Sequence, residues 1–516
     1  MKKDKVKRPK KQKCLEKVKN KEKNSAFEEY IDRLPENDRA ELSLFMRDVE
    51  THISLPRSWQ VMLRRDYMRA FLYYASHGVS LLEAMNRLNP RKLGGFYARP
   101  PILWYPLDNA AKIYPLSMKH GQMAVFRLSI YLKKDVVPEL LQMALNFTIK
   151  RFPSFATTVK KGFFWHYLDT SKRRYSTWEE SNVPCRPLKI SASGSQSFRV
   201  LYYQNRISVE YFHILTDGTG GMVFLKTLAA EYLRLLGADI KTGNGVLDIN
   251  DLPRIEEAEN EFLRADRAEK ASGFVDKQVV QMSGRLSKIK PCKVLHFKMD
   301  ANKLHELARS KDSTVTAYIL SRMFVAGRHA TDENSGDMSI QVPVNMRKFS
   351  PSETLRNFSL YCGIRFPISH ITSADDILVK IKHQLDEKSS RKAMSEMLNG
   401  AVKLVSSVRY IPLFIKAPVA GAIYGFLGDK IFCNTLSNLG VVTFPDGMAE
   451  HVESMDFVLG TEITNRAACA MVTVGNVATL SISKLTADPS FEEALYDLLC
   501  QDGIVPVVEG SELYES

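Results

Sequence analysis

The six residues from His213 to Gly218 (HILTDG) combine side chains that could move a proton. A neutral imidazole at His213 could take a proton from a substrate hydroxyl, which is worth roughly 10²–10⁴ in rate. Asp217 precedes a glycine, and in a tight turn its carboxylate could accept hydrogen bonds from loop N–H groups or from an arginine. A single histidine near a strand end is more often structural, so the surrounding sequence must decide between general-base catalysis and a structural turn.

The residues around this motif predict a strand, a turn and a helix. The segment Leu201 to Tyr211 alternates and is rich in aromatic and β-branched residues, which is typical of a strand. Residues 216–221 (TDGTGG) break that strand. From Met222 to Leu236 the apolar residues recur at helical spacing. His213 is therefore expected on a loop that two regular elements hold still and that stays open to a substrate.

This stretch also resembles a known active-site segment. The sequence YFHILTDGTGGMVFLKTLAAEYL is similar to the H-x-x-x-D-G segment of the chloramphenicol acetyltransferase-like superfamily, which includes condensation domains, and most of all to its bacterial alcohol acetyltransferase branch. The wider family pattern often has a second histidine directly before the base, where this chain has Phe212. The resemblance implies an acyltransferase that moves an acyl group from a thioester, most simply acyl-CoA such as acetyl-CoA, to an alcohol. His213 would be its general base.

Further segments match the family in order over about residues 105–510, among them LDNAAKIYP, VFRLSIYL and GFFWHYLD. The resemblance implies an α/β fold with two chloramphenicol acetyltransferase-like subdomains, each of mixed sheet and helices, around a central tunnel. A small helical module precedes them. The expected organisation is a disordered basic arm (1–23), the helical module (24–98), the N-terminal subdomain (105–240), a crossover linker (241–290) and the C-terminal subdomain (291–516).

The remaining candidate site residues come from two other matching segments. In VPVNMRKFSPSETLRNFS the resemblance implies that Arg347 holds Asp217 across the interface, although Arg347 could also be an exposed loop charge. Asn345 in the same segment is a candidate for oxyanion or substrate binding. Ser437 and Asn438 resemble a family strand end whose hydroxyl and amide could donate to the oxyanion of acyl transfer. A strand-terminating turn is the alternative, since Ser, Asn and Gly are common there.

Periodicity predicts the other elements in outline. It indicates a strand at 155–169, a polar, surface-exposed and mobile crossover at 237–290, and a mostly helical region at 374–432. Further strands are expected at 123–133, 293–304, 338–346 and 358–368, and further helices at 136–153, 315–329 and 490–503.

Charge is concentrated at one end of the chain. The 516 residues carry a net charge of +14, and residues 1–23 supply +9 of it, from twelve Lys and Arg against three Asp and Glu. The rest of the chain, at +5, lacks the footprint of a nucleic-acid-binding domain. The arm itself is most simply solvated, and contact with an anionic membrane or with nucleic acid is the alternative.

Cysteine spacing and apolar runs suggest a cytoplasmic protein. The seven cysteines include no C-x-x-C pair, which fits buried thiols better than disulfides or zinc. No bound metal and no permanent cofactor are expected, and acyl-CoA and a small-molecule alcohol would be substrates. The most apolar run, Tyr410 to Leu427, is interrupted by Lys416, prolines and glycines, so a buried helix pair is expected rather than a membrane span. Peripheral membrane contact stays open, and oligomeric state is not set.

Two other function classes stay open. One is a binding protein that keeps the fold without turnover, for which Phe212 leaves room. The other is an interaction protein that acts through the basic arm and the helical module.

Overall fold

The computed structural model describes residues 25–53, 55–94, 102–112, 114, 123–171, 173–181, 183–188, 197–272, 276–416, 418, 430–460 and 465–514. The expected basic arm lies outside the described residues, and so does most of the helix pair expected at 410–427. Within the described part, no helix combines the length and the apolar character needed to cross a bilayer. The six cysteines described there are free thiols, and five of them are buried.

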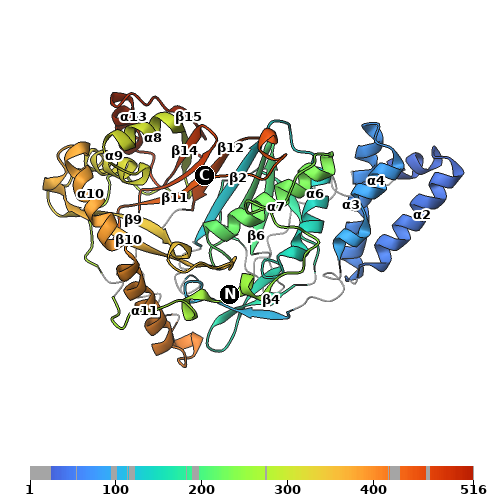
Figure 1. Ribbon diagram of the computed structural model, residues 1–516, viewed down its shortest axis with the longest axis horizontal. Coiled ribbons are helices and arrows are strands. Elements are labelled where there is room, and N and C mark those ends of the chain that lie inside the picture. Colours follow the sequence, from blue (N-terminus) through green and yellow to red (C-terminus); the bar gives the residue numbers. More distant parts are fainter. Residues whose placement is uncertain are drawn as a thin grey trace.

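The N-terminal module is a group of helices at one end of the molecule (Figure 1). Its helices are residues 25–32, α2 (Glu36–Thr51), α3 (Arg57–Ser76) and α4 (Leu81–Arg87). Ser80 caps α4 by accepting a hydrogen bond from the Glu83 N–H. Tyr67 and Phe71 of α3 are buried in the same hydrophobic core as the first subdomain. The module is therefore packed onto the body through a shared core.

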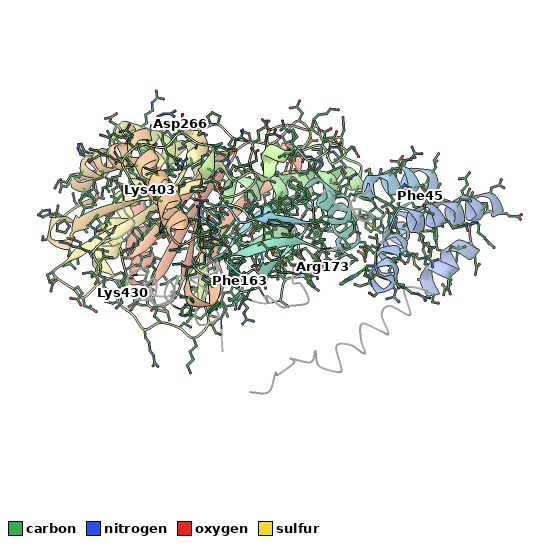
Figure 2. The ribbon with its side chains drawn as sticks, turned by 90° about the horizontal axis from the view of Figure 1, so that it is seen from below. Phe45, Phe163, Arg173, Asp266, Lys403 and Lys430 are labelled. Atoms are coloured by element: carbon green, nitrogen blue, oxygen red, sulfur yellow. The ribbon has the colours of Figure 1, made fainter. Side chains whose placement is uncertain are left out.

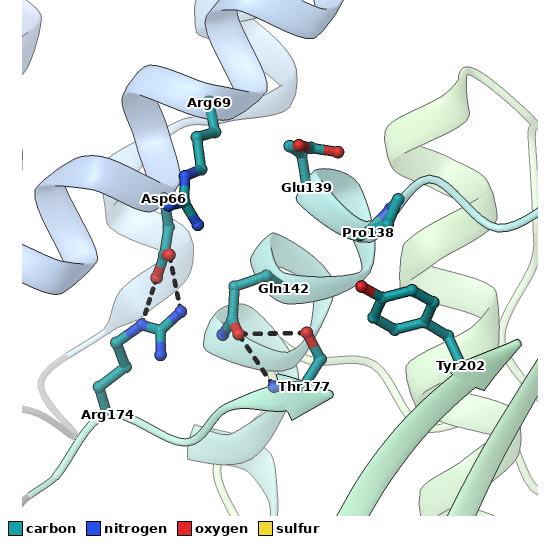
Figure 3. A pocket seen from close by; sticks show the side chains of 8 residues that line it. All are labelled: Asp66, Arg69, Pro138, Glu139, Gln142, Arg174, Thr177 and Tyr202. Carbon is teal, nitrogen blue, oxygen red and sulfur yellow. Dashed lines mark hydrogen bonds and ion pairs between the residues drawn. The ribbon is translucent and has the colours of Figure 1, made fainter. Parts of the chain in front are cut away.

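A polar join also links the module to the first subdomain (Figure 3). Asp66 of α3 receives hydrogen bonds from Arg174 at 2.5 and 2.7 Å. The pair borders a cavity of about 140 Å³ whose lining contains two acidic and two basic side chains. The lining is completed by Arg69, Pro138, Glu139, Gln142, Thr177 and Tyr202. This balanced charge marks the cavity as part of the join, and none of the motif residues lines it.

The first subdomain is a five-stranded sheet in the order β12-β2-β7-β6-β5. Its strands are β12 (Val452–Leu459), β2 (Val125–Leu132), β7 (Arg206–Phe212), β6 (Phe198–Tyr203) and β5 (Thr177–Glu179). The helices α6 (Pro138–Thr148) and α7 (Gly218–Leu236) pack against each other beside it (Figure 1). A smaller sheet, in the order β1-β4-β3, holds β1 (Trp104–Pro106), β4 (His166–Thr170) and β3 (Thr157–Lys161).

The second subdomain is a seven-stranded mixed sheet in the order β10-β9-β11-β13-β14-β8-β15. Its strands are β10 (Ser359–Pro367), β9 (Asp337–Asn345), β11 (Asn434–Val442), β13 (Ala467–Val474), β14 (Val477–Lys484), β8 (Lys293–Asp300) and β15 (Val507–Gly510). Its helices are α8 (Ala301–Ser310), α9 (Val315–His329), α10 (Ala374–Lys388), α11 (Arg391–Ser407) and α13 (Ser490–Gln501). The core of this half is separate from the core of the first.

Strand β12 crosses between the halves. It comes from the second half of the chain, yet it pairs antiparallel with β2 at the edge of the first sheet, with Phe457 opposite Leu128. The boundary between the two halves near residue 290 stays a prediction. Strand β12 belongs to the part of the chain after that boundary. The exchange ties the two sheets together, so that residues from both halves can be held at fixed positions between them.

Four sequence predictions of local structure were wrong. The segments 201–211 and 155–169 are each a hairpin rather than one strand, with turns between Tyr203 and Arg206 and between Lys161 and His166. The strand expected at 293–304 ends at Asp300, where α8 begins, whereas the mostly helical region expected from residue 374 is present as α10 and α11. The crossover segment is not wholly exposed, because Glu257 is buried against Arg151, with hydrogen bonds of 2.6 Å.

Candidate active site

The motif loop joins β7 to α7, as the alternation and the helical spacing predict. Phe212 ends β7 and is buried in the core, so it occupies a packing position. The His213 N–H donates to the Ala124 carbonyl at 2.8 Å, which fixes the first residue of the loop to the neighbouring strand region. Asp217 then caps α7, because its Oδ1 accepts from the Gly220 N–H at 3.1 Å. Both ends of the loop are therefore anchored.

A hydrogen-bonded chain reaches the imidazole from the other half of the protein. His213 Nδ1 lies 2.8 Å from Asn357 Oδ1. The Asn357 Nδ2 group donates in turn to Asp108 Oδ2 at 3.2 Å, and this orients the amide oxygen toward the histidine. An amide oxygen only accepts, so Nδ1 must carry the proton and Nε2 keeps its lone pair. The chain therefore selects the tautomer in which Nε2 can act as a base.

Asp108 anchors the far end of this chain. Its carboxylate also accepts from the Ala111 N–H at 2.7 Å and lies 3.5 Å from the Arg356 guanidinium. Burial raises the pKa of the Asp108 carboxyl, and the charge of Arg356 opposes that rise. These contacts fix the segment that precedes Tyr114 against the loop that carries Asn357.

Aromatic rings and burial complete the surroundings of the imidazole. The Tyr114 ring stacks on His213 with centroids 4.7 Å apart, and Phe126 meets it edge-on at 5.1 Å. Burial lowers the pKa of His213 from 6.5, while Asp217, Asp108 and the hydrogen bond that Nδ1 donates to Asn357 oppose the fall. The imidazole is half-buried and neutral near neutral pH, which is the state a general base requires.

Asp217 faces Arg347, the partner that the family resemblance implies. Arg347 Nη1 donates to Asp217 Oδ2 at 2.8 Å, and the Phe358 N–H donates to the same oxygen at 2.8 Å. Arg347 Nη2 donates to the carbonyls of Thr354 and Arg356, each at 2.8 Å. One guanidinium thus joins the motif loop to the turn that carries Asn357. The guanidinium is largely buried, with an 11% exposed side chain, and each of its two terminal nitrogens has a hydrogen-bond partner.

Backbone contact at this joint leaves no room for a side chain. An added Cβ at Gly220 would lie 2.1 Å from the Leu355 carbonyl oxygen and 2.3 Å from Thr216 Oγ1. Thr216 Oγ1 itself donates to the Leu355 carbonyl at 2.6 Å. The second glycine after Asp217 is therefore required by the close approach of the two halves.

Of the other candidates, Asn345 lies next to the start of α7 and Asn438 lies next to the start of α9. Asn345 donates from Nδ2 to Thr219 Oγ1 at 3.3 Å, and its Oδ1 accepts from the Arg347 N–H. Asn438 donates from Nδ2 to Thr316 Oγ1 at 3.0 Å and accepts from the Gly440 N–H. The hydroxyl of Ser437 has no hydrogen-bond partner within the described part of the chain. Of the predicted oxyanion donors, Ser437 is therefore the one left available.

Strand β11 brings Leu439 against the start of α7. Its pairing with β13 is irregular between Asn438 and Val441, where Gly440 has φ +74°. At this bulge the side chain of Leu439 touches the start of α7, since an added Cβ at Gly218 would lie 2.7 Å from Leu439 Cδ2. The described residues contain no group of three or more His, Cys, Asp or Glu placed to hold a metal ion.

Sequence reasoning missed Asn357 and Tyr114 and gave Asp108 little weight. All three act through contacts between segments far apart in the chain, such as the 144 residues between His213 and Asn357. Their only signal was proximity in sequence to matched motifs, since Asn357 lies within the segment that supplied Arg347. Residue type alone does not separate such an asparagine from a turn residue.

Replacement of Asn357 with leucine should lower kcat by roughly tenfold, because it removes one hydrogen bond that selects the tautomer of His213. The acid limb of the pH–rate profile should also move to lower pH, because the hydrogen bond that His213 donates to Asn357 raises the pKa of His213. Steady-state kinetics across the acid range measures both effects.

Asn399→Leu is the matched control. Asn399 lies on α11 and is also buried. Its amide donates to the carbonyls of Ala268, Glu269 and Lys270. This variant should leave the position of the acid limb unchanged. If the acid limb does not move in Asn357→Leu either, Asn357 has only a structural role.

Comparison with solved structures identifies the fold. TRI101 from Fusarium sporotrichioides, complexed with coenzyme A and T-2, is similar with a TM-score of 0.55 at 11% identity, over 76% of this chain and 97% of that one. Polyketide synthase associated protein 5 from Mycobacterium tuberculosis gives 0.51 at 12%, over 77% and 97%. TRI3 trichothecene 15-O-acetyltransferase from Fusarium sporotrichioides gives 0.50 at 12%, over 77% and 94%.

No protein-family model matches the chain, and no curated protein sequence matches it either. At 11–12% identity the structural likeness establishes the fold alone. The predicted two-lobed chloramphenicol acetyltransferase-like architecture of mixed sheets and helices is confirmed. The bacterial alcohol acetyltransferase branch and the tunnel between the lobes stay predictions.

Proposed function

We propose that this protein is an acyltransferase that moves an acyl group from an acyl thioester, most simply acyl-CoA, to the hydroxyl of a small-molecule alcohol, with His213 as general base. The observation that carries the proposal is the chain from Asp108 through Asn357 to His213 Nδ1, which leaves Nε2 free to accept a proton. The fold adds support, since similar structures include a protein solved with coenzyme A and a 15-O-acetyltransferase.

In this mechanism Nε2 of His213 takes the hydroxyl proton as the alcohol oxygen attacks the thioester carbonyl carbon. The carbonyl oxygen becomes negative in the tetrahedral intermediate, where the Ser437 hydroxyl is the proposed hydrogen-bond donor. Collapse breaks the carbon–sulfur bond, and the imidazolium returns the proton to the leaving sulfur. The products are an ester and a free thiol. No permanent cofactor takes part, and acyl-CoA is consumed as a substrate.

Asp217 and Arg347 have a different role in this proposal. Their ion pair lies between the two halves of the protein, with Oδ1 of the carboxylate used to cap α7. The pair holds the loop so that the imidazole stays aligned with Asn357. Asn345 supports the same joint through Thr219. These residues position the base without touching the reacting atoms.

Activity should depend on pH through His213. Its folded-state pKa is lowered from 6.5 by burial, so kcat/KM should rise with pH through a midpoint below 6.5. As pH falls through the folded-state pKa, the imidazole gains a proton and ceases to be a base. The unfolded chain binds that proton at a higher pH, so stability should also fall as pH drops below 6.5. An acid limb of the pH–rate profile centred above pH 6.5 would show that a group other than His213 controls the rate.

A substrate screen tests the proposed function. The protein is incubated with short- and long-chain acyl-CoA donors and with alcohols of graded size, and new esters are sought by mass spectrometry. Formation of an ester that needs both substrates and the active protein supports the proposal and names the substrate class. If every pair fails while acyl-CoA still binds, the protein is a binding protein that keeps the fold.

A further inference from the structure

Six exposed apolar side chains form one continuous surface, which we name the aromatic ledge. It consists of Phe163, Phe164, Tyr410, Ile411, Phe414 and Ile415. The exposed fraction is 65% for Phe163 and 71% for both Tyr410 and Phe414. Scattered exposed apolar residues are ordinary, but a contiguous group that includes four aromatic rings marks an interaction surface.

The ledge is built by both halves of the protein. Phe163 and Phe164 occupy the turn between β3 and β4, and the other members follow α11. The Leu413 N–H donates to the Phe163 carbonyl at 2.8 Å, and the rings of Phe164 and Tyr410 lie 6.4 Å apart. Figure 2 looks at the molecule from this side and labels Phe163. The rings are therefore displayed by a fixed backbone.

All the Lys, Arg, Asp and Glu positions in the segments that carry the ledge are basic. Residues 157–168 and 402–416 contain five Lys and Arg and no Asp or Glu. Lys161 and Arg409 are exposed, and the Arg409 guanidinium lies 4.4 Å from the centre of the Tyr410 ring. Lys160 pairs with Asp169 across the hairpin. The exposed charge that borders the ledge is thus positive.

A second copy of this chain is a poor occupant for such a surface. A twofold interface places the same patch against itself, so Lys161 and Arg409 would face like charges. An anionic lipid surface satisfies both features at once. Aromatic side chains favour the headgroup boundary, and the negative surface potential attracts nearby Lys and Arg side chains.

We propose that the aromatic ledge docks the protein on an anionic lipid surface, with the rings at the headgroup boundary and Lys161 and Arg409 toward the lipid phosphates. The ledge is also linked to the site. Trp165, beside Phe164, lies under the Lys416 and Lys112 ammonium groups at 3.2 and 5.6 Å from the ring centre. Lys112 belongs to the segment that supplies Asp108 and Tyr114 to the imidazole. Docking would therefore place the segment that carries Asp108 and Tyr114 near the bilayer. The docking proposal does not depend on the proposed acyl transfer.

Vesicle binding by the full-length chain tests this proposal. Co-sedimentation is measured with vesicles of phosphatidylcholine alone and of phosphatidylcholine with phosphatidylserine, at low and high salt. Binding is expected with phosphatidylserine present and should weaken in high salt. The double variant Phe163→Ser with Phe414→Ser should bind at least about tenfold more weakly, because it removes two apolar anchors. Lys161→Glu with Arg409→Glu should lose binding to the anionic vesicles.

The controls separate the ledge from other sources of binding. Leu44→Ser with Leu82→Ser removes two exposed apolar side chains from α2 and α4, in the helical module at one end of the molecule (Figure 1), and it should bind as the wild type does. Deletion of residues 1–23 should leave ledge-dependent binding in place. The proposal is overturned if the ledge variants bind normally, if deletion of the arm removes all binding, or if the ledge variants abolish only a dimer.

Discussion

Turnover by the His213→Ala protein is expected to fall by roughly 10²–10⁴, the usual contribution of a positioned general base. The imidazole is the only group that the Asp108–Asn357 chain orients, and its Nε2 has the free lone pair. The variant should stay folded, because His213 is only half-buried and its neighbours Tyr114 and Phe126 remain. Turnover is measured as thiol release at saturating substrate concentrations. Folding is measured by a thermal melt.

His296→Ala is the control for loss of a buried imidazole. His296 is buried, more deeply than the half-buried His213, and its Nδ1 lies 2.9 Å from Ser481 Oγ, but it belongs to the sheet of the second half. Its replacement should leave kcat close to the wild-type value. Equal losses in the two variants would mean that packing rather than proton transfer limits the rate.

Loss of the Arg347 side chain should affect both folding and turnover. Arg347→Met leaves the Asp217 carboxylate buried with only its two N–H partners, and removal of one member of a buried pair typically costs about 3–5 kcal/mol. The same change frees the turn that carries Asn357, because Arg347 also binds the Thr354 and Arg356 carbonyls. Denaturant unfolding should show a lower midpoint, and kcat measured well below that midpoint should also fall.

Arg174→Met supplies the matched comparison. Its partner, Asp66, is as deeply buried as Asp217, but the pair joins the helical module to the first subdomain (Figure 3). The stability loss should be similar, while kcat at a temperature where both proteins are folded should stay near wild type. A fully active Arg347→Met protein would contradict the bracing role of the Asp217–Arg347 pair.

Sequence patterns were sufficient for the outline of the fold because they report burial on one element at a time. The alternation before His213 and the helical spacing after it predicted β7 and α7 on either side of the motif loop. The hairpin at 201–211 was missed because its turn contains no glycine. Gln204 adopts φ +48° in a turn without glycine, so the strand looked continuous through it.

Long-range pairing accounts for most of what the sequence did not reveal. Strand β12 reads as an ordinary apolar strand of the second half, and nothing in its residues indicates that Phe457 lies opposite Leu128 of the first sheet. Asn357 is a second such case, because its role depends on its position in space between Asp108 and His213. Arg347 could be named only because a family resemblance carries that long-range information, and its role remains a proposal.

The central claim is that the site joins an alcohol to a thioester acyl group, and the most direct test is the dependence of thiol release on alcohol. Initial rates are measured as the alcohol concentration rises from zero, with ester and thiol quantified in the same samples. The mechanism predicts that thiol release rises with alcohol to a plateau and that ester and thiol form in equal amounts. Thiol release that is independent of alcohol, or that yields free acid instead of ester, would contradict acyl transfer by His213.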